Sequence, residues 1–116
     1  MEPINNVVIE FYKYLLASKC KDIALYDLRK EQQGCDFIFV VTNSSQILNK
    51  KFATAMLTEM NSNVFPEGYS KGEWIIFDFN DIVLHSFIPS MREKYSLDKL
   101  WKNKRVDLSK LLKNKD

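Results

Sequence analysis

The chain is poor in residues that bind metals or form disulfides. Its 116 residues include two cysteines, Cys20 and Cys35, and one histidine, His85. A structural zinc site usually needs four Cys or His ligands, and the two cysteines lack the C-x-x-C spacing of such sites. The sequence therefore excludes a structural zinc site, and we expect a protein without a cofactor. A disulfide stays open, although no other feature indicates secretion.

Long apolar runs are also missing. No stretch approaches the roughly 20 apolar residues that span a bilayer. The N-terminal segment has no basic region followed by an apolar run, and it is not the Arg-rich, acid-poor segment of a transit peptide. We therefore expect a cytoplasmic protein in a reducing compartment, without membrane contact.

Charge of one sign is not in large excess. The 17 Lys and Arg residues and the 15 Asp and Glu residues give a net charge of +2, which is too small to indicate a nucleic-acid binder by itself. The basic residues of the C-terminal stretch are Lys99, Lys102, Lys104, Arg105, Lys110, Lys113 and Lys115. Contact with RNA phosphates and a solvated, flexible end both fit this stretch. We expect a single domain over residues 1–116 with a basic flexible tail from about residue 105.

Aromatic side chains, in contrast, are plentiful. They make up 13% of the chain, and all apolar residues together make up 46%. A chain of this length buries a core without metals or disulfides. Some of the rings are therefore expected on a surface that meets a partner.

Helical and strand periodicities alternate along the first half of the chain. We expect an amphipathic helix over residues 3–18, a short strand over 23–28 and a central strand, apolar on both faces, over 37–42. The short polar residues 43–45 cap a second helix that ends near residues 61–63. The residues expected in the buried stripes of the two helices are Ile4, Val7, Val8, Phe11, Leu15 and Leu16, then Leu48, Phe52, Ala55, Met56 and Met60.

A β-hairpin dominates the second half. Two apolar runs, residues 74–79 and 82–87, flank the turn formers Asn80 and Asp81. With the first half, this order predicts an α/β fold with a mixed sheet of four or five strands and flanking helices. The strand order stays open.

Short elements are expected after the hairpin. Residues 91–95 can form a helical turn, and Ser96 can cap a second short helix that reaches Trp101. Residues 106–112 are expected as a short strand or turn.

The two faces of the hairpin differ in character. With a two-residue turn, alternate side chains point to opposite faces. The face expected to pack on a helix pairs Phe79 with Ile82, Phe77 with Leu84 and Ile75 with Ser86. The other face pairs Asp78 with Val83, Ile76 with His85 and Trp74 with Phe87. Rings mixed with a carboxylate and an imidazole are typical of a protein-binding surface, although a covering helix also explains them.

Residues in catalytic patterns are sparse. Asp78 and His85 lie diagonally on the mixed hairpin face with Asp81 nearby, and such a pair can orient a general base, but no nucleophile accompanies it. Residues 42–45 resemble a phosphate-binding turn, yet the glycines of such turns are absent and helix capping explains the pattern. Asp36 lacks an Asp-x-Asp partner for two metal ions. We therefore expect a protein that is not an enzyme.

Several unusual residues occur in a characteristic order. Residues 74–87 contain a Trp strand, an aspartate turn and a Val-x-His-x-Phe strand, and residues 92–101 contain Arg…Tyr-x-Leu-x-x-Leu-Trp. Glu67-Gly68 lies upstream. The first-half segments that fit the same pattern are residues 22–27, 35–40 and 42–45. Over almost its whole length, the chain resembles the Iojap, or ribosomal silencing factor, family.

The resemblance implies a partner and a mechanism. Family members have a nucleotidyltransferase-like core without its catalytic carboxylates. They bind the large ribosomal subunit at ribosomal protein L-fourteen, block joining of the small subunit and so repress translation. Two questions stay open: whether the chain contacts neighbouring rRNA, and whether it is a monomer or a homodimer. The expected partner-binding residues are Trp74, Ile76, Asp78, His85 and Phe87, with Arg92 and Tyr95 at the edge.

The chain departs from the family pattern at two glycine positions, where Asn43 and Asn80 stand. Asparagine tolerates left-handed backbone geometry better than most residues, so the turn at Asn43 is expected to survive. Two rival functions also stay open: a small nucleotidyltransferase-like enzyme that uses Asp78, Asp81 and His85, and an RNA-binding module that uses the basic tail.

Overall fold

The architecture is a mixed sheet with helices on both sides. A computed structural model describes residues 3–31, 34–60 and 63–112. These residues form a four-stranded sheet in the order β1 (Lys21–Asp27), β2 (Phe37–Thr42), β4 (Ile82–Phe87), β3 (Trp74–Asp78). β2 runs parallel to β4, whereas β1 and β3 run antiparallel to their neighbours. The expected mixed α/β fold is confirmed.

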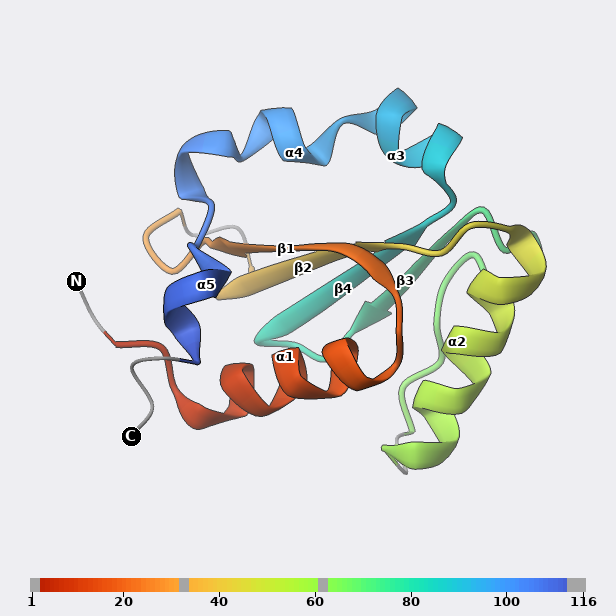
Figure 1. Ribbon diagram of the computed structural model, residues 1–116, viewed down its shortest axis with the longest axis horizontal. Helices are drawn as coiled ribbons and strands as arrows, with labels where there is room; N and C mark the ends of the chain where they lie inside the picture. The colour runs from red at the N-terminus through yellow and green to blue at the C-terminus, as the bar shows by residue number, and fades with distance from the viewer. Residues whose placement is uncertain (1–2, 32–33, 61–62, 113–116) are drawn as a thin grey trace.

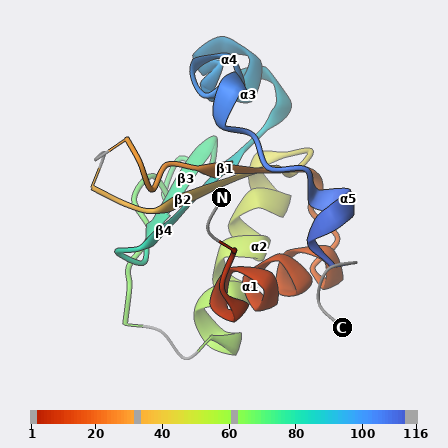
Figure 2. The same ribbon diagram turned by 90° about the vertical axis from the view of Figure 1, so that its left-hand side faces the viewer.

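The helices divide between the two faces of the sheet (Figures 1 and 2). α1 (Asn6–Ala17) and α2 (Gln46–Glu59) cover one face, which we call the lower face. The short helices α3 (Pro89–Tyr95) and α4 (Leu97–Leu100) lie over the opposite, upper face. Every residue of β2 is buried, as expected for a central strand between two covered faces.

The first helix is shorter than expected and turned about its axis. It begins at Asn6 because the side chain of Asn5 accepts a hydrogen bond from the backbone N–H of Val8 at 3.1 Å. Its buried residues are Val8, Ile9, Phe11 and Leu15. The predicted stripe residues Val7 and Leu16 are exposed. The wide apolar band of this segment did not define which part of it faces the sheet.

The second helix buries a polar residue in its stripe. Ser45 caps it as expected, accepting from the N–H of Leu48 at 3.1 Å. Its buried residues are Asn49, Phe52, Ala53 and Met56, whereas the expected Leu48, Ala55 and Met60 are exposed. Asn49 is tolerated there because its side-chain amide donates to the carbonyl oxygens of Gly72 at 2.9 Å and Ser86 at 3.0 Å. The helix ends at Glu59, and residues 61 and 62 of its expected end lie outside the described residues.

The hairpin pairs in the predicted register. Trp74 faces Phe87, Ile76 faces His85 and Asp78 faces Val83. Asn80 adopts the left-handed backbone conformation, with φ of 79°, that the turn requires. Asn43 does not belong to the described residues with positive φ, so no left-handed turn forms there.

The C-terminal part packs more closely than expected. Ser96 does not cap α4 with its side chain; its hydroxyl donates instead to the carbonyl oxygen of Glu93 at 2.7 Å. Of the strand or turn expected over residues 106–112, the turn forms: it is the helical turn α5 (Leu108–Leu111), and Leu111 is buried. Val106 N–H donates to Leu25 O at 2.8 Å. The segment from residue 105 to 112, which was assigned to a flexible tail, therefore lies against the body, while residues 113–116 lie outside the description.

Two further features bear on the sequence expectations. Cys20 and Cys35 are both free thiols. Among the described residues, no helix has the length and apolar character needed to cross a membrane.

Candidate docking face

The predicted contact residues of the hairpin share the upper face of β3 and β4. Trp74, Ile76 and Asp78 alternate along β3, and His85 and Phe87 alternate along β4. β3 is one of the two edge strands of the sheet, and β1 is the other. α3 and α4 leave this edge of the sheet partly uncovered, so the side chains of Ile76 and His85 are half-buried and that of Asp78 is exposed. We call the exposed and half-buried residues Trp74, Ile76, Asp78, His85 and Tyr95 the docking face.

A cluster of rings fixes one end of the docking face. The Trp74 ring stacks on the Phe87 ring at 4.9 Å between centroids, and the Tyr95 ring of α3 lies 4.7 Å from Trp74. Phe87 is fully buried beneath them, so it supports Trp74 and does not present a surface of its own. Tyr95 is 44% exposed. Rings held in this way present a large rigid surface at low entropic cost.

His85 belongs to this ring cluster rather than to an acid–base pair. Its Nδ1 accepts a hydrogen bond from Trp74 Nε1–H at 3.0 Å. Burial lowers the pKa of His85 to about 4, because desolvation disfavours the charged imidazolium. The imidazole is therefore neutral at pH 7, with its proton on Nε2. Among the described residues, no hydrogen bond joins His85 to Asp78, the pair considered from the sequence as a possible acid–base site.

Asp78 provides the negative charge of the docking face. Its carboxylate accepts a hydrogen bond from the backbone N–H of Asn80 at 2.9 Å. This bond belongs to the hairpin turn and orients the carboxylate at the end of β3. The side chain is exposed, so it keeps its hydration until a partner removes it.

Arg92 has a different role from the one expected at the edge of this face. Its guanidinium bonds both oxygens of Asp98 at 3.0 Å, the hydroxyl of Thr42 at 2.9 Å and the backbone oxygen of Asp22. The side chain is only 15% exposed. Arg92 therefore fastens α3 and α4 to the sheet, and a partner cannot pair with it without breaking these bonds.

Asp98 is the acidic centre of this fastening. Burial raises the pKa of Asp98, but hydrogen bonds from Arg92 and Tyr26 outweigh burial and lower it below its usual value. Burial and the bond to Asp98 raise the pKa of Tyr26 to about 12. The Tyr26 hydroxyl donates to Asp98 at 2.5 Å. The carboxylate thus stays ionised and links β1 to α4.

Phe65 is an exposed ring that sequence reasoning missed. Glu67 pairs with Ile76 through two backbone hydrogen bonds of 2.9 Å, which extends the edge beyond β3. Val64 packs on the lower core, whereas Phe65 is 88% exposed. Phe65 lies two residues before Glu67, in the segment that leads to the edge of the sheet at β3. An aromatic residue two positions before Glu67 was the available signal in the sequence.

Gly68 explains how this extra segment approaches the edge so closely. Its φ is +79°, and a Cβ atom there would lie 2.1 Å from the backbone oxygen of Trp74. Only glycine fits this position without moving backbone. The Glu67–Gly68 pair of the family pattern therefore has a structural reason.

Similarity to known proteins covers most of the chain. The family described as "Ribosomal silencing factor during starvation" matches residues 1–116. The ribosomal silencing factor of Chromobacterium violaceum is 29% identical over 105 residues, which are 87% of this chain and 84% of that protein. The mouse protein named mitochondrial assembly of ribosomal large subunit protein 1 is 39% identical over 101 residues, which are 80% of this chain and 44% of that protein.

Two solved structures have a similar fold. A crystal structure of a protein from Chromobacterium violaceum has a TM-score of 0.72 at 28% identity, covering 85% of this chain and 88% of that chain. A structure from Bacillus halodurans has a TM-score of 0.70 at 21% identity, covering 89% and 99%, and shows the same fold. The chain belongs to the ribosomal silencing factor family.

Proposed function

We propose that this chain acts in the cytoplasm by binding the large ribosomal subunit through ribosomal protein L-fourteen and sterically blocking the small subunit. Membership in the silencing factor family supports a role in translational repression. The name of the mouse relative supports the large subunit as partner. The observation that carries the proposal is an exposed carboxylate, Asp78, on the same edge strand and the same face as the Trp74 ring, which packs against Phe87 and Tyr95.

The ring side chains would supply the anchoring contacts. Trp74 and Tyr95 are held in position by stacking, so little conformational entropy is lost when they contact a partner. Ile76 and the exposed Phe65 extend the apolar area along the edge. Specific interfaces bury about 800 Å² per partner around a few such anchors. Phe87 and Arg92 contribute by keeping the anchors in place.

Asp78 would select the partner by charge. A basic side chain of the partner can pair with this carboxylate, and a like charge would be repelled. The neutral His85 adds no competing positive charge beside it, because its pKa is about 4. The docking face therefore suits a surface that mixes apolar groups with Lys or Arg.

The blockade itself needs no chemistry. A domain with extents of 39 × 30 × 25 Å occupies space that the small subunit would otherwise fill. Only tight binding to one subunit is then required. The proposal therefore assigns no catalytic role to Asp78, Asp81 or His85.

Subunit joining measured on sucrose gradients tests this proposal. Purified large and small subunits are mixed with and without the protein, and the joined ribosome peak is compared. The protein should reduce the joined peak and migrate with the large subunit. Unchanged joining at saturating protein, or migration with the small subunit alone, would contradict the proposal.

The rival enzyme makes a different prediction at the same residues. A nucleotide-processing enzyme would bind nucleotide and magnesium at Asp78, Asp81 and His85, and would release a product. The proposed silencing factor should show no product and no change in the Trp74 resonances. Turnover that disappears in an Asp78→Asn variant would favour the enzyme.

A further inference from the structure

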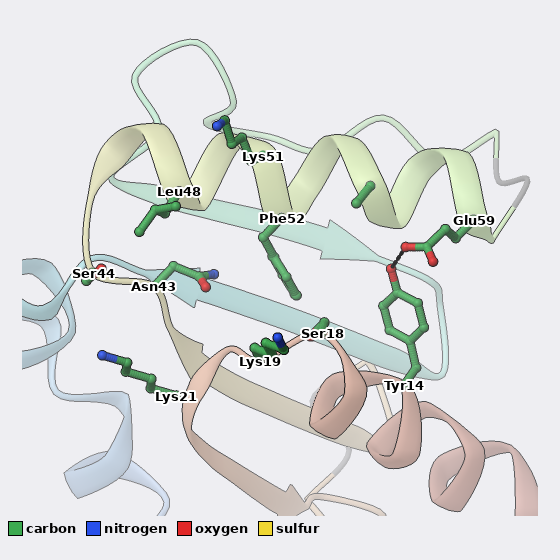
Figure 3. Close-up of a pocket in the computed structure, with 11 residues that line it drawn as sticks. Tyr14, Ser18, Lys19, Lys21, Asn43, Ser44, Leu48, Lys51, Phe52 and Glu59 are labelled. Carbon is green, nitrogen blue, oxygen red and sulfur yellow. Dashed lines mark hydrogen bonds between the residues drawn. The ribbon is translucent and has the colours of Figure 1, made fainter.

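A groove opens between α1 and α2 on the lower side of the sheet (Figure 3). Its volume is about 400 Å³, within the range of small-molecule sites. It lies next to residues 43 and 44, directly after the carboxyl end of β2. In sheets with parallel strands, ligands characteristically bind outside these ends. The docking face is on the opposite side of the sheet.

Three lysines line the groove on different sides (Figure 3). Lys19 lies in the link between α1 and β1, Lys21 is the first residue of β1, and Lys51 lies in α2. All three are exposed. Within the described part of the chain, none of them forms an ion pair within 4.0 Å. Three cations around one opening favour a ligand that carries more than one negative charge.

The single carboxylate that lines the groove is already engaged. Glu59 accepts a hydrogen bond from the Tyr14 hydroxyl at 2.9 Å, between α2 and α1 (Figure 3). Burial and this bond raise the pKa of Tyr14 to about 12, so the donor proton is retained at neutral pH. Glu59 therefore bonds Tyr14 and not a lysine. The three lysines outnumber this one carboxylate, so the groove keeps an excess of positive charge.

The polar turn at the groove is held rigidly. The side-chain amide of Asn43 donates to Asn49 Oδ1 and Ser86 Oγ, both at 3.1 Å. These bonds fix the turn relative to α2 and β4. Ser44 follows at the groove wall, and α2 begins two residues later. The N-terminal end of this 14-residue helix adds favourable potential for an anion beside the lysines.

An apolar wall accompanies the basic part. Leu48, Phe52 and Ala55 line the groove along α2. Leu48 is 47% exposed, so a ligand can cover apolar surface there. A purely ionic ligand would leave this wall unused, whereas a ligand with a ring and an anionic tail would contact both parts.

We propose that this groove binds a phosphorylated small molecule of nucleotide size. Its phosphates would lie nearest Lys19, with Lys21 and Lys51 at the rim of the groove, and its ring would lie against Leu48. No bond of the ligand is made or broken. Because the site is across the sheet from the docking face, the ligand and a ribosomal partner can bind at the same time. The inference does not depend on the proposed function.

Titration calorimetry of the full chain without ribosomes tests the site. The probes are a nucleoside triphosphate, inorganic pyrophosphate and the unphosphorylated nucleoside. The variant combines Lys19→Gln, Lys21→Gln and Lys51→Gln. The control combines Lys30→Gln, Lys102→Gln and Lys110→Gln, which removes the same charge at exposed positions elsewhere. Thermal denaturation verifies that both variants fold.

The triphosphate should bind tightest, pyrophosphate more weakly and the nucleoside not measurably. The groove variant should bind the triphosphate at least about tenfold more weakly than the control variant. Amide resonances of Asn43, Ser44 and Leu48 should shift on binding, while that of Trp74 stays unchanged. Absence of binding at millimolar triphosphate, equal weakening in both variants, or equal affinity for pyrophosphate would overturn the proposal.

Discussion

The two faces of the sheet differ in how completely helices cover them. On the lower face, α1 and α2 have 12 and 14 residues and seal a core that includes the Phe11–Phe39 stack at 5.1 Å. On the upper face, α3 and α4 have seven and four residues. They bury Tyr26, Ile38 and Val40 but leave the outer strand partly open. The lower face thus has the more complete core, and the short upper helices leave part of β3 uncovered.

Truncation of a lower-face ring should have the largest effect on stability. Phe39 is fully buried in β2, so Phe39→Ala should lower the free energy of unfolding by about 4 kcal/mol. Ile76→Ala, on the half-buried part of the upper face, should cost about 1 kcal/mol or less. Urea denaturation measures both. Equal losses of unfolding free energy would show that the two faces contribute equally to stability and would contradict this comparison.

Removal of the Arg92 side chain should have the next largest effect. Arg92→Ala leaves the half-buried Asp98 without its main partner, and we expect a loss of about 2 to 3 kcal/mol. Arg92→Lys should restore only part of it, because an ammonium cannot bond both oxygens of Asp98 and Thr42 in the same geometry. Urea denaturation of the two variants gives the comparison. Full recovery with lysine would mean that charge alone matters.

His85 should make stability depend on pH. Its pKa is about 4 in the folded chain against an ordinary 6.5. Between these values the unfolded chain binds a proton that the folded chain does not, so the free energy of unfolding falls as the pH falls. We expect His85 to contribute up to about 3 kcal/mol to this decrease. Below pH 4, Asp27 and Asp98 lose the stability gained from their lowered pKa values.

The variant His85→Gln isolates this contribution. Glutamine can still accept from Trp74 Nε1–H but does not titrate. Its unfolding free energy, measured by denaturation at a series of pH values, should decrease less than that of the unmodified chain between pH 6.5 and pH 4. Parallel curves would show that His85 is not the group responsible.

Phe65→Ala should have the smallest effect on stability. The ring is almost fully exposed, so the change should alter the free energy of unfolding by no more than about 0.5 kcal/mol. Affinity for the large subunit should nevertheless fall roughly fivefold or more if the ring is a contact. Val7→Ala, at an exposed position of α1 under the opposite face, is the control. Equal affinities of the two variants would remove Phe65 from the proposed interface.

The hairpin was predictable because its register depends on local alternation and turn length. Trp74, Ile76 and Asp78 therefore fell on one face as expected. The central position of β2 was also evident from its continuous apolar run. Such patterns depend on neighbouring residues, so they can be recognised without knowing the long-range contacts of the chain.

The errors arose where a role depends on distant residues. The fastening role of Arg92 depends on Asp22 and Thr42, which the sequence does not place beside it. Asn49 was absent from the predicted stripe, because the partners that allow its burial, Gly72 and Ser86, lie far along the chain. The exposure of Phe65 depends on how its segment joins the sheet edge, where Glu67 pairs with Ile76 far along the chain.

Affinity for isolated large subunits, compared between two charge reversals, tests the docking face most directly. Asp78→Lys reverses the charge on the docking face, and Glu10→Lys does so on α1 under the lower face. Asp78→Asn removes the charge but can keep the hydrogen bond from the Asn80 N–H, so it separates the loss of charge from a folding defect. Cosedimentation should weaken about 100-fold for Asp78→Lys, less for Asp78→Asn, and not for Glu10→Lys. Undiminished binding by a folded Asp78→Lys protein would contradict the account.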